Sequence, residues 1–270
     1  MDKINLLSEW IKALLIKDHL PFHLFENHTI IEDGMNMYEY WMYEKKLFHD
    51  LAPLYDLDQH FSIKIISENR LDNHKLSVCF YLYNTYNKIV YKMTQTIIEK
   101  NSGYLLSGNN FLCQVVPKYI IINNEIQGCA LAIQSPYVVK NIISPDIFLE
   151  NLTLGANYEE DGFYSAQFSN EDICQNHWYS FYLVLSKNEQ IIKEKRKIYF
   201  DNFLTELNPI QIDKNKIILL DQTYPVNLAA FSKIQGCENY SYPRNISLLT
   251  EKYTKIIATD CLDNDWIYNL

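Results

Sequence analysis

The sequence has 270 residues, of which 48% are hydrophobic and 21% are charged, a balance typical of globular rather than disordered proteins. A chain of this length can bury a sizeable core and has room for two domains. Its formal net charge of −9 opposes binding to a nucleic-acid backbone or to an anionic membrane. No apolar run approaches the ~20 residues that cross a bilayer, so we expect no membrane span. Because the net charge is negative, we also expect no nucleic-acid partner.

Residues 1–50 are predicted to form a helical and aromatic-rich segment. Apolar residues recur at helical spacing from residue 4 to residue 15, which predicts an amphipathic helix over residues 3–17 that ends before Pro21. Residues 34–50 then concentrate methionine and aromatic side chains, and their pattern fits either a strand or a short helix. These aromatic rings either stack on a ligand or pack against the neighbouring sheet. The candidate ligand-binding residues are Trp41, Tyr40 and Tyr38.

Residues 51–150 are predicted to form a first β module. Between residues 76 and 93, two stretches of alternating apolar residues flank a polar loop at residues 84–88, which is typical of a β-hairpin. A strand at residues 61–65 precedes this hairpin. One or two further strands are expected at residues 111–122, where Pro117 marks an edge or a bulge.

Residues 151–212 repeat part of this pattern and are predicted to form a second, shorter β module. The tripeptide Phe-Tyr-Leu at residues 80–82 returns at residues 181–183, again followed by a polar loop and an apolar pair. This internal repeat indicates two related sandwich-like modules. The second one is short for a full sandwich, which takes about 100 residues, so a single larger sandwich containing both hairpins is the alternative.

The second hairpin also carries the one basic cluster of this acidic chain. Its members are Lys187, Lys193, Lys195, Arg196 and Lys197. Alternation along a strand predicts that the cluster forms a solvated face rather than a binding surface.

Residues 213–270 are predicted to form an α/β tail that resembles a βαβ unit. Apolar runs at residues 216–220 and 255–259 have the composition of buried strands, and helical patterns at residues 226–234 and 246–253 lie between them. An aspartate follows each predicted strand. With a right-handed crossover, Asp221 and Asp260 would meet at the carboxyl edge, where open α/β sheets bind ligands.

Two sets of residues are candidates for catalysis. The first is the pair of carboxylates on Asp221 and Asp260. The second is Cys174 with His177, because a thiolate nucleophile needs an imidazole within hydrogen-bond reach. Neither set completes a known motif. The residues after Asp221 lack the second aspartate of the phosphatase motif DxDx[TV], and no Gly-x-Ser-x-Gly occurs.

The six cysteines include no CxxC pair, and we expect most of them to be buried thiols in a reducing compartment. The first twenty residues lack the features of a signal peptide, so the expected location is the cytoplasm. We expect no metal and no cofactor. Pro21 interrupts the helical spacing between His19 and His23, and glycine-rich phosphate-binding motifs do not occur.

The two Phe-Tyr-Leu hairpins, about twenty residues each, resemble strands of immunoglobulin-like modules in bacterial surface and polysaccharide-associated systems; what this resemblance implies is a fold. The duplicated β scaffold and the 21 tyrosines favour a non-catalytic binding or accessory protein. Its expected ligand is a glycan or a partner protein in a bacterial surface-polymer or secretion pathway. The alternative is an enzyme, a hydrolase or an acyl or glycosyl transferase, that uses the tail carboxylates or the Cys/His pair.

Overall fold

The computed structural model describes residues 1–16, 18–26, 35–108, 111–147, 153–158, 162–169, 173, 175–187, 190–214, 216–219, 227–232, 236–240, 247–249 and 253–270. The chain forms two compact units, Met1–Gln114 and Val115–Leu270. Both are rich in antiparallel β-strands, so the prediction of a mainly β protein is confirmed. The finer division at residues 50, 150 and 212 stays a prediction.

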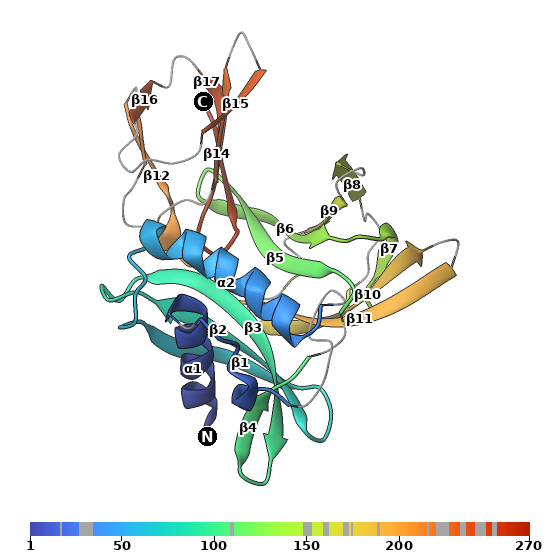
Figure 1. Ribbon diagram of the computed structural model, residues 1–270. Coiled ribbons are helices and arrows are strands. Elements are labelled where there is room, and N and C mark those ends of the chain that lie inside the picture. The colour runs from blue at the N-terminus through green and yellow to red at the C-terminus, as the bar shows by residue number, and fades with distance from the viewer. Residues whose placement is uncertain are drawn as a thin grey trace. The chain divides into compact units, whose positions relative to one another are not determined.

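Helices and one antiparallel sheet make up the described part of the first unit (Figure 1). Its elements are α1 (Lys3–Ile16), η1 (Phe22–Leu24), α2 (Met37–Leu54), β1 (Ser62–Arg70), β2 (Lys75–Tyr83), β3 (Ile89–Lys100) and β4 (Gly103–Leu106). The strands follow one another in the order β1-β2-β3-β4. The predicted N-terminal helix, the strand at residues 61–65 and the hairpin at residues 76–93 are therefore confirmed.

Aromatic contacts hold the two helices against this sheet. The indole of Trp10 on α1 stacks on the ring of Tyr40 on α2, with 5.9 Å between ring centroids. The Tyr40 hydroxyl lies 3.2 Å from Oε1 of Gln95 on β3, and Phe48 of α2 meets Tyr91 of β3 edge-on. Residues 91 and 95 lie on the same face of β3, since side chains two apart along a strand share a face. That face carries the helices.

The β2–β3 hairpin is closed by an asparagine that satisfies its polar loop. The Asn84 side chain accepts hydrogen bonds from the backbone N–H groups of Tyr86 and Lys88, and it donates to the carbonyl of Tyr55. Asn87 adopts a left-handed φ of 58°, which asparagine tolerates better than most residues. These contacts fix the register in which Phe80 of β2 lies opposite Met93 of β3.

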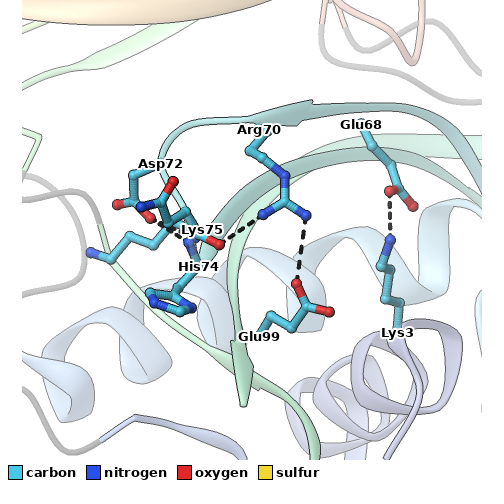
Figure 2. Close-up of polar contacts among 8 residues, drawn as sticks. Lys3, Glu68, Arg70, Asp72, His74, Lys75 and Glu99 are labelled. Carbon is cyan, nitrogen blue, oxygen red and sulfur yellow. Dashed lines mark hydrogen bonds and ion pairs between the residues drawn. The ribbon is translucent and has the colours of Figure 1, made fainter. Parts of the chain in front are cut away.

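The β1–β2 turn is also fixed by a side chain. One carboxylate oxygen of Asp72 accepts hydrogen bonds of 2.8 Å from the backbone N–H groups of His74 and Lys75 (Figure 2). These bonds stabilise the charged carboxylate and lower the pKa of Asp72 below its usual range. The turn is an Asx-type structure of the kind that aspartate favours.

Ion pairs join α1 to the same sheet and join two of its strands. Lys3 of α1 pairs with Glu68 of β1, and Arg70 of β1 lies 3.5 Å from the carboxylate of Glu99 on β3 (Figure 2). Exposed pairs of this kind contribute about 0–1 kcal/mol each. The charges in this region therefore pair with one another and add little to the stability of the unit.

The described part of the second unit consists almost entirely of strands. They are β5 (Gln114–Ile122), β6 (Glu125–Gln134), β7 (Val138–Ile143), β8 (Thr153–Tyr158), β9 (Phe163–Ser169), β10 (His177–Lys187), β11 (Gln190–Phe200), β12 (Ile210–Asp213), β13 (Lys216–Leu219), β14 (Asn227–Ser232), β15 (Gly236–Tyr240), β16 (Ser247–Leu249), β17 (Tyr253–Thr259) and β18 (Asp265–Asn269). A 3₁₀ helix, η4 (Thr205–Leu207), precedes β12.

These strands form three sheets. The orders are β11-β10-β7, β12-β13-β16 and β15-β14-β17-β18-β5-β6-β9-β8. Phe181 of β10, fully buried, lies 5.6 Å from the ring of Phe168 on β9, and Tyr119 of β5 meets Phe200 of β11 edge-on. The three-stranded β11-β10-β7 sheet and the eight-stranded sheet thus share an aromatic core.

The predicted α/β tail is wrong. Residues 227–232, within the first predicted helix, form β14, and residues 247–249, within the second, form β16. Strand β14 pairs antiparallel with both β15 and β17. The apolar run near Leu228 is only about half as long as an average helix, and tertiary pairing on both sides overrides weak local helix propensity.

The basic cluster, whose members other than Lys187 lie on β11, is not the uniform solvated face that was predicted. Lys193 and Lys195 are exposed, but Arg196 is out of phase with them, and its side chain is only 7% exposed. Its Nε lies 2.6 Å from Oε1 of Glu194, another buried residue. Register places Arg196 opposite Phe181, so this ion pair lies on the core face of the sheet. Arg196 is therefore a buried, ion-paired residue of the core and not part of a solvated face.

Candidate ligand site

A pocket of about 610 Å³ opens in the second unit, a volume in the range of ligand-binding sites. Its walls come from the β5–β6 turn, from η4 and β12, and from the end of β18. The lining residues are Asn123, Asn124, Thr205, Glu206, Asn208, Ile210, Gln211, Ile212 and Tyr268. Four carboxamides, two hydroxyls and one carboxylate therefore face a single cavity.

The first wall is a tight turn made of two asparagines. Asn123 and Asn124 are the two residues between β5 and β6, and both have left-handed φ values, 50° and 70°. Two consecutive left-handed residues in a two-residue hairpin form a type I′ turn, for which asparagine is a preferred residue. The backbone N–H of Asn123 donates to the carbonyl of Ile267, which ties the turn to β18. The position of the turn beside the pocket is thus fixed by its backbone conformation and by this hydrogen bond.

A tyrosine and two asparagines form the floor. The hydroxyl of Tyr268 lies 2.8 Å from Oδ1 of Asn208 and 3.0 Å from Oδ1 of Asn124, and the Nδ2 of Asn208 donates to Asn124. The hydroxyl has one proton, so it donates to one of these oxygens at a time. Burial raises the pKa of Tyr268 to about 12, which keeps the hydroxyl protonated at neutral pH. This network fixes both amides in place.

The chemistry of the lining suits a ligand with many uncharged hydrogen-bonding groups. A carboxamide offers both a donor and an acceptor, and a hydroxyl offers both as well. Ile210 and Ile212 add apolar contact, and Glu206 is the charged member of the lining. Sugar hydroxyls and the peptide main chain both match such a site.

The aromatic residues predicted to bind a ligand lie on α2 and not at this pocket. Tyr40 and Trp41 are each only 3% exposed, whereas Tyr38 is 57% exposed. Tyr40 packs against α1 and β3 as described above, and Lys45 lies over the Trp41 ring at 5.0 Å. The side chains of Tyr40 and Trp41 are therefore largely buried, and the assignment of these three residues to ligand binding stays a prediction. Tyr38 keeps a surface on which a ring could stack.

Asp260 is a structural carboxylate in the loop between β17 and β18. Its Oδ1 accepts hydrogen bonds from the backbone N–H groups of Leu262 and Asn264, and its Oδ2 accepts from the Asn264 amide and from Nε1 of Trp266. The side chain is fully buried. Because β17 and β18 are antiparallel, the loop is a hairpin end, and the predicted carboxyl edge of a parallel unit does not exist there. Asp260 organises the loop.

The ionisation of Asp260 should make stability depend on pH. Burial raises the pKa of Asp260 to about 6 from 3.8, although its four donors favour the charged form. The folded state then holds this proton more tightly than the unfolded state does. The resulting contribution, about 3 kcal/mol, is complete below about pH 4 and is lost as the pH rises through about 6.

This prediction is checked by urea unfolding of the wild type and of Asp260→Asn at about pH 4 and about pH 7. Other carboxylates titrate in both proteins, so the difference between the two pH dependences isolates Asp260. We expect the wild type to lose stability relative to the variant as the pH rises. Parallel pH profiles would contradict the assignment.

The other catalytic candidates are placed only in part. His177 begins β10 as an exposed residue, with its ring 4.8 Å from that of Tyr179. Cys174 and Asp221 lie outside the described residues, so the Cys174–His177 pair and the Asp221–Asp260 pair stay predictions. Neither His177 nor Asp260 lines the pocket.

Four cysteines behave as expected for buried thiols: Cys79, Cys113, Cys129 and Cys261. Burial raises the pKa of the Cys129 thiol to about 12, so it is not a nucleophile at neutral pH. Within the described ranges, no group of three or more His, Cys, Asp or Glu side chains is arranged to hold a metal ion. Of the helices in that part of the chain, none has the length and apolar character needed to cross a bilayer.

The pocket residues were missed by sequence reasoning. The dipeptide Asn123–Asn124 between two apolar runs is typical of a hairpin turn, and Asn208-Pro209 is typical of a turn. Both turns could therefore have been predicted from the sequence. No local sequence signal connects these two turns to Tyr268, which lies beside them because strand β18 pairs with β5.

Comparisons of the chain with protein-family models, with curated proteins and with solved structures find no match.

Proposed function

We propose that the protein is a non-catalytic binding protein whose ligand site is the amide-lined pocket of the second unit. The observation that carries this proposal is the floor of the pocket, where Tyr268, Asn208 and Asn124 are locked together by hydrogen bonds. Amides held in fixed positions lose little entropy when a ligand arrives, and such preorganisation favours binding. The ligand is a chain rich in uncharged hydrogen-bonding groups, a glycan or the main chain of a partner protein.

The duplicated scaffold belongs to the same proposal. We propose that the hairpins β2–β3 and β10–β11 are copies of one ancestral unit in sandwich-like modules. In support, Phe80 and Phe181 are both fully buried, and each lies on the first strand of its hairpin. Strands β2 and β10 also each have a neighbour on both sides. The contact between Phe168 and Phe181 joins two sheets face to face, as in a sandwich.

Binding is tested with the labelled full chain on a glycan array and on an array of immobilised peptides. We expect retention on one of the two arrays, and a loss of about tenfold in affinity for Asn208→Ala, because the variant removes hydrogen bonds that position the floor. The matched control is Asn202→Ala, which changes an exposed asparagine that does not line the pocket. Silence on both arrays, or equal binding by the Asn208 and Asn202 variants, would contradict the proposed site.

A further inference from the structure

One wall of the pocket is the edge of a β-strand. Strand β12 lies at the end of the order β12-β13-β16. Three consecutive residues of it, Ile210, Gln211 and Ile212, line the pocket. Side chains alternate between the two faces of a strand, so a cavity that touches three residues in a row faces the strand's edge. Of the residues that the structure describes in β13, none lines the cavity, which places it on the side of β12 away from β13.

Register determines which backbone groups of β12 point into this space. Asp213 pairs with Lys216 across a two-residue turn, Ile212 with Ile217 and Gln211 with Ile218. In a two-residue hairpin the pair next to the turn exchanges both backbone hydrogen bonds, and pairs then alternate. Asp213 and Gln211 therefore bond to β13, while the N–H and C=O of Ile210 and Ile212 point outward.

One of these outward groups is already occupied by the pocket floor. The N–H of Ile210 donates to Oδ1 of Asn208 at 2.9 Å. For Ile212, no backbone partner outside the β12–β13 ladder exists within the described part of the chain. The N–H and C=O of Ile212 are thus the donor and acceptor that a neighbouring strand would engage.

The charge around this edge selects among possible strands. Glu206 is the charged residue of the lining, whereas at the end of β12 the exposed Asp213 lies next to the exposed Lys214 and opposite the exposed Lys216, so the charges there offset one another. The whole chain carries a formal net charge of −9. A segment with a lysine or an arginine is therefore favoured over an acidic one, both in its approach and beside Glu206.

We propose that the pocket binds an extended, basic segment of a partner protein, which adds a strand to the β12 edge. This inference rests on the proposed function and names its ligand as a polypeptide main chain. Hydrogen bonds to Ile212 supply affinity, and the fixed amides of Asn124 and Asn208 border the site. Glu206 selects a cationic side chain. Strand addition of this kind is a recurring mode of peptide recognition.

The test uses synthetic heptapeptides selected from a random phage-displayed library on the full chain, with affinities measured by fluorescence anisotropy. Ile212→Pro removes the outward N–H but leaves the bonds of Gln211 and Asp213 to β13, and proline is tolerated on edge strands in this orientation. Ile212→Val is the matched control, because it keeps the N–H. We expect Ile212→Pro to weaken binding at least tenfold and Ile212→Val to leave it within about twofold.

A second measurement needs no protein variant. Single backbone N-methylation along a selected peptide removes one donor at a time, and we expect alternate positions to lose binding, as strand pairing requires. Uniform tolerance of N-methylation, or unchanged binding by Ile212→Pro, overturns the inference. Retention of glycans in the pocket without any selected peptide also overturns it, and that result leaves the proposed binding function standing.

Discussion

Phe80→Ala is expected to lower the free energy of unfolding of the first unit by about 3–5 kcal/mol, the usual cost of removing a buried phenylalanine ring. Phe80 is fully buried on β2, which has β1 on one side and β3 on the other. Its register partners Ile65 and Met93 lie on the same face as the helices, so the ring lies beneath α1 and α2. Replacement of the ring by alanine would leave a cavity between the sheet and the helices.

Urea unfolding of the full chain measures this loss. The matched control is Tyr86→Ala in the same hairpin, because the Tyr86 side chain is 68% exposed and its substitution should change stability by less than about 0.5 kcal/mol. Phe181→Ala tests the corresponding position in the second unit, and a loss of similar size is expected. If Phe80→Ala were as mild as Tyr86→Ala, the described core of the first unit would be wrong.

Asp260→Ala is expected to lower the free energy of unfolding of the second unit by about 4 kcal/mol at neutral pH. The variant leaves four donors without their acceptor, among them the buried indole N–H of Trp266. Each unsatisfied buried donor costs about 1–3 kcal/mol, and relief of the desolvated charge offsets part of the sum. Oδ1 of Asn264 also accepts a hydrogen bond from the backbone N–H of Tyr119 on β5. Displacement of Asn264 would therefore also weaken the eight-stranded sheet.

Asp260→Asn serves as the graded control. It keeps an oxygen for the two backbone donors but places an N–H₂ group opposite Trp266 and the Asn264 amide. The expected order of stability is wild type, then asparagine, then alanine. Amide hydrogen exchange at Leu262 and Asn264 gives a local readout, and unchanged protection in Asp260→Ala would refute the role assigned to the carboxylate.

The sequence predicts those parts of the fold that depend on local pattern. The amphipathic N-terminal helix and both Phe-Tyr-Leu hairpins are visible because spacing and polar loops belong to single contiguous segments. The tail was misjudged near Leu228, where a short apolar run fits either a helix or a strand, and the choice depended on β15 and β17. Arg196 was misplaced because a basic residue out of phase with its neighbours was counted with them.

The candidate site was beyond prediction for a different reason. Its parts come from a turn at Asn124, a loop at Asn208 and a strand at Tyr268, and only sheet pairing brings them together. Aromatic richness pointed instead to Tyr40 and Trp41, whose side chains are buried, the ring of Tyr40 being stacked on Trp10. Composition identifies residues that can bind, whereas topology decides which of them are left facing a cavity.

The parallel pairing of β18 with β5 has a consequence for the order in which the parts of the molecule can fold during synthesis. Asn124 and Tyr268, which meet at the pocket floor, are 144 residues apart in the sequence. At a translation rate of about 5–20 residues per second, synthesis of the intervening chain takes roughly 7–29 s. During that interval β5 lacks its β18 neighbour and exposes an unpaired edge. The residues of the first unit are therefore all synthesised well before β18 arrives to complete the pocket of the second unit.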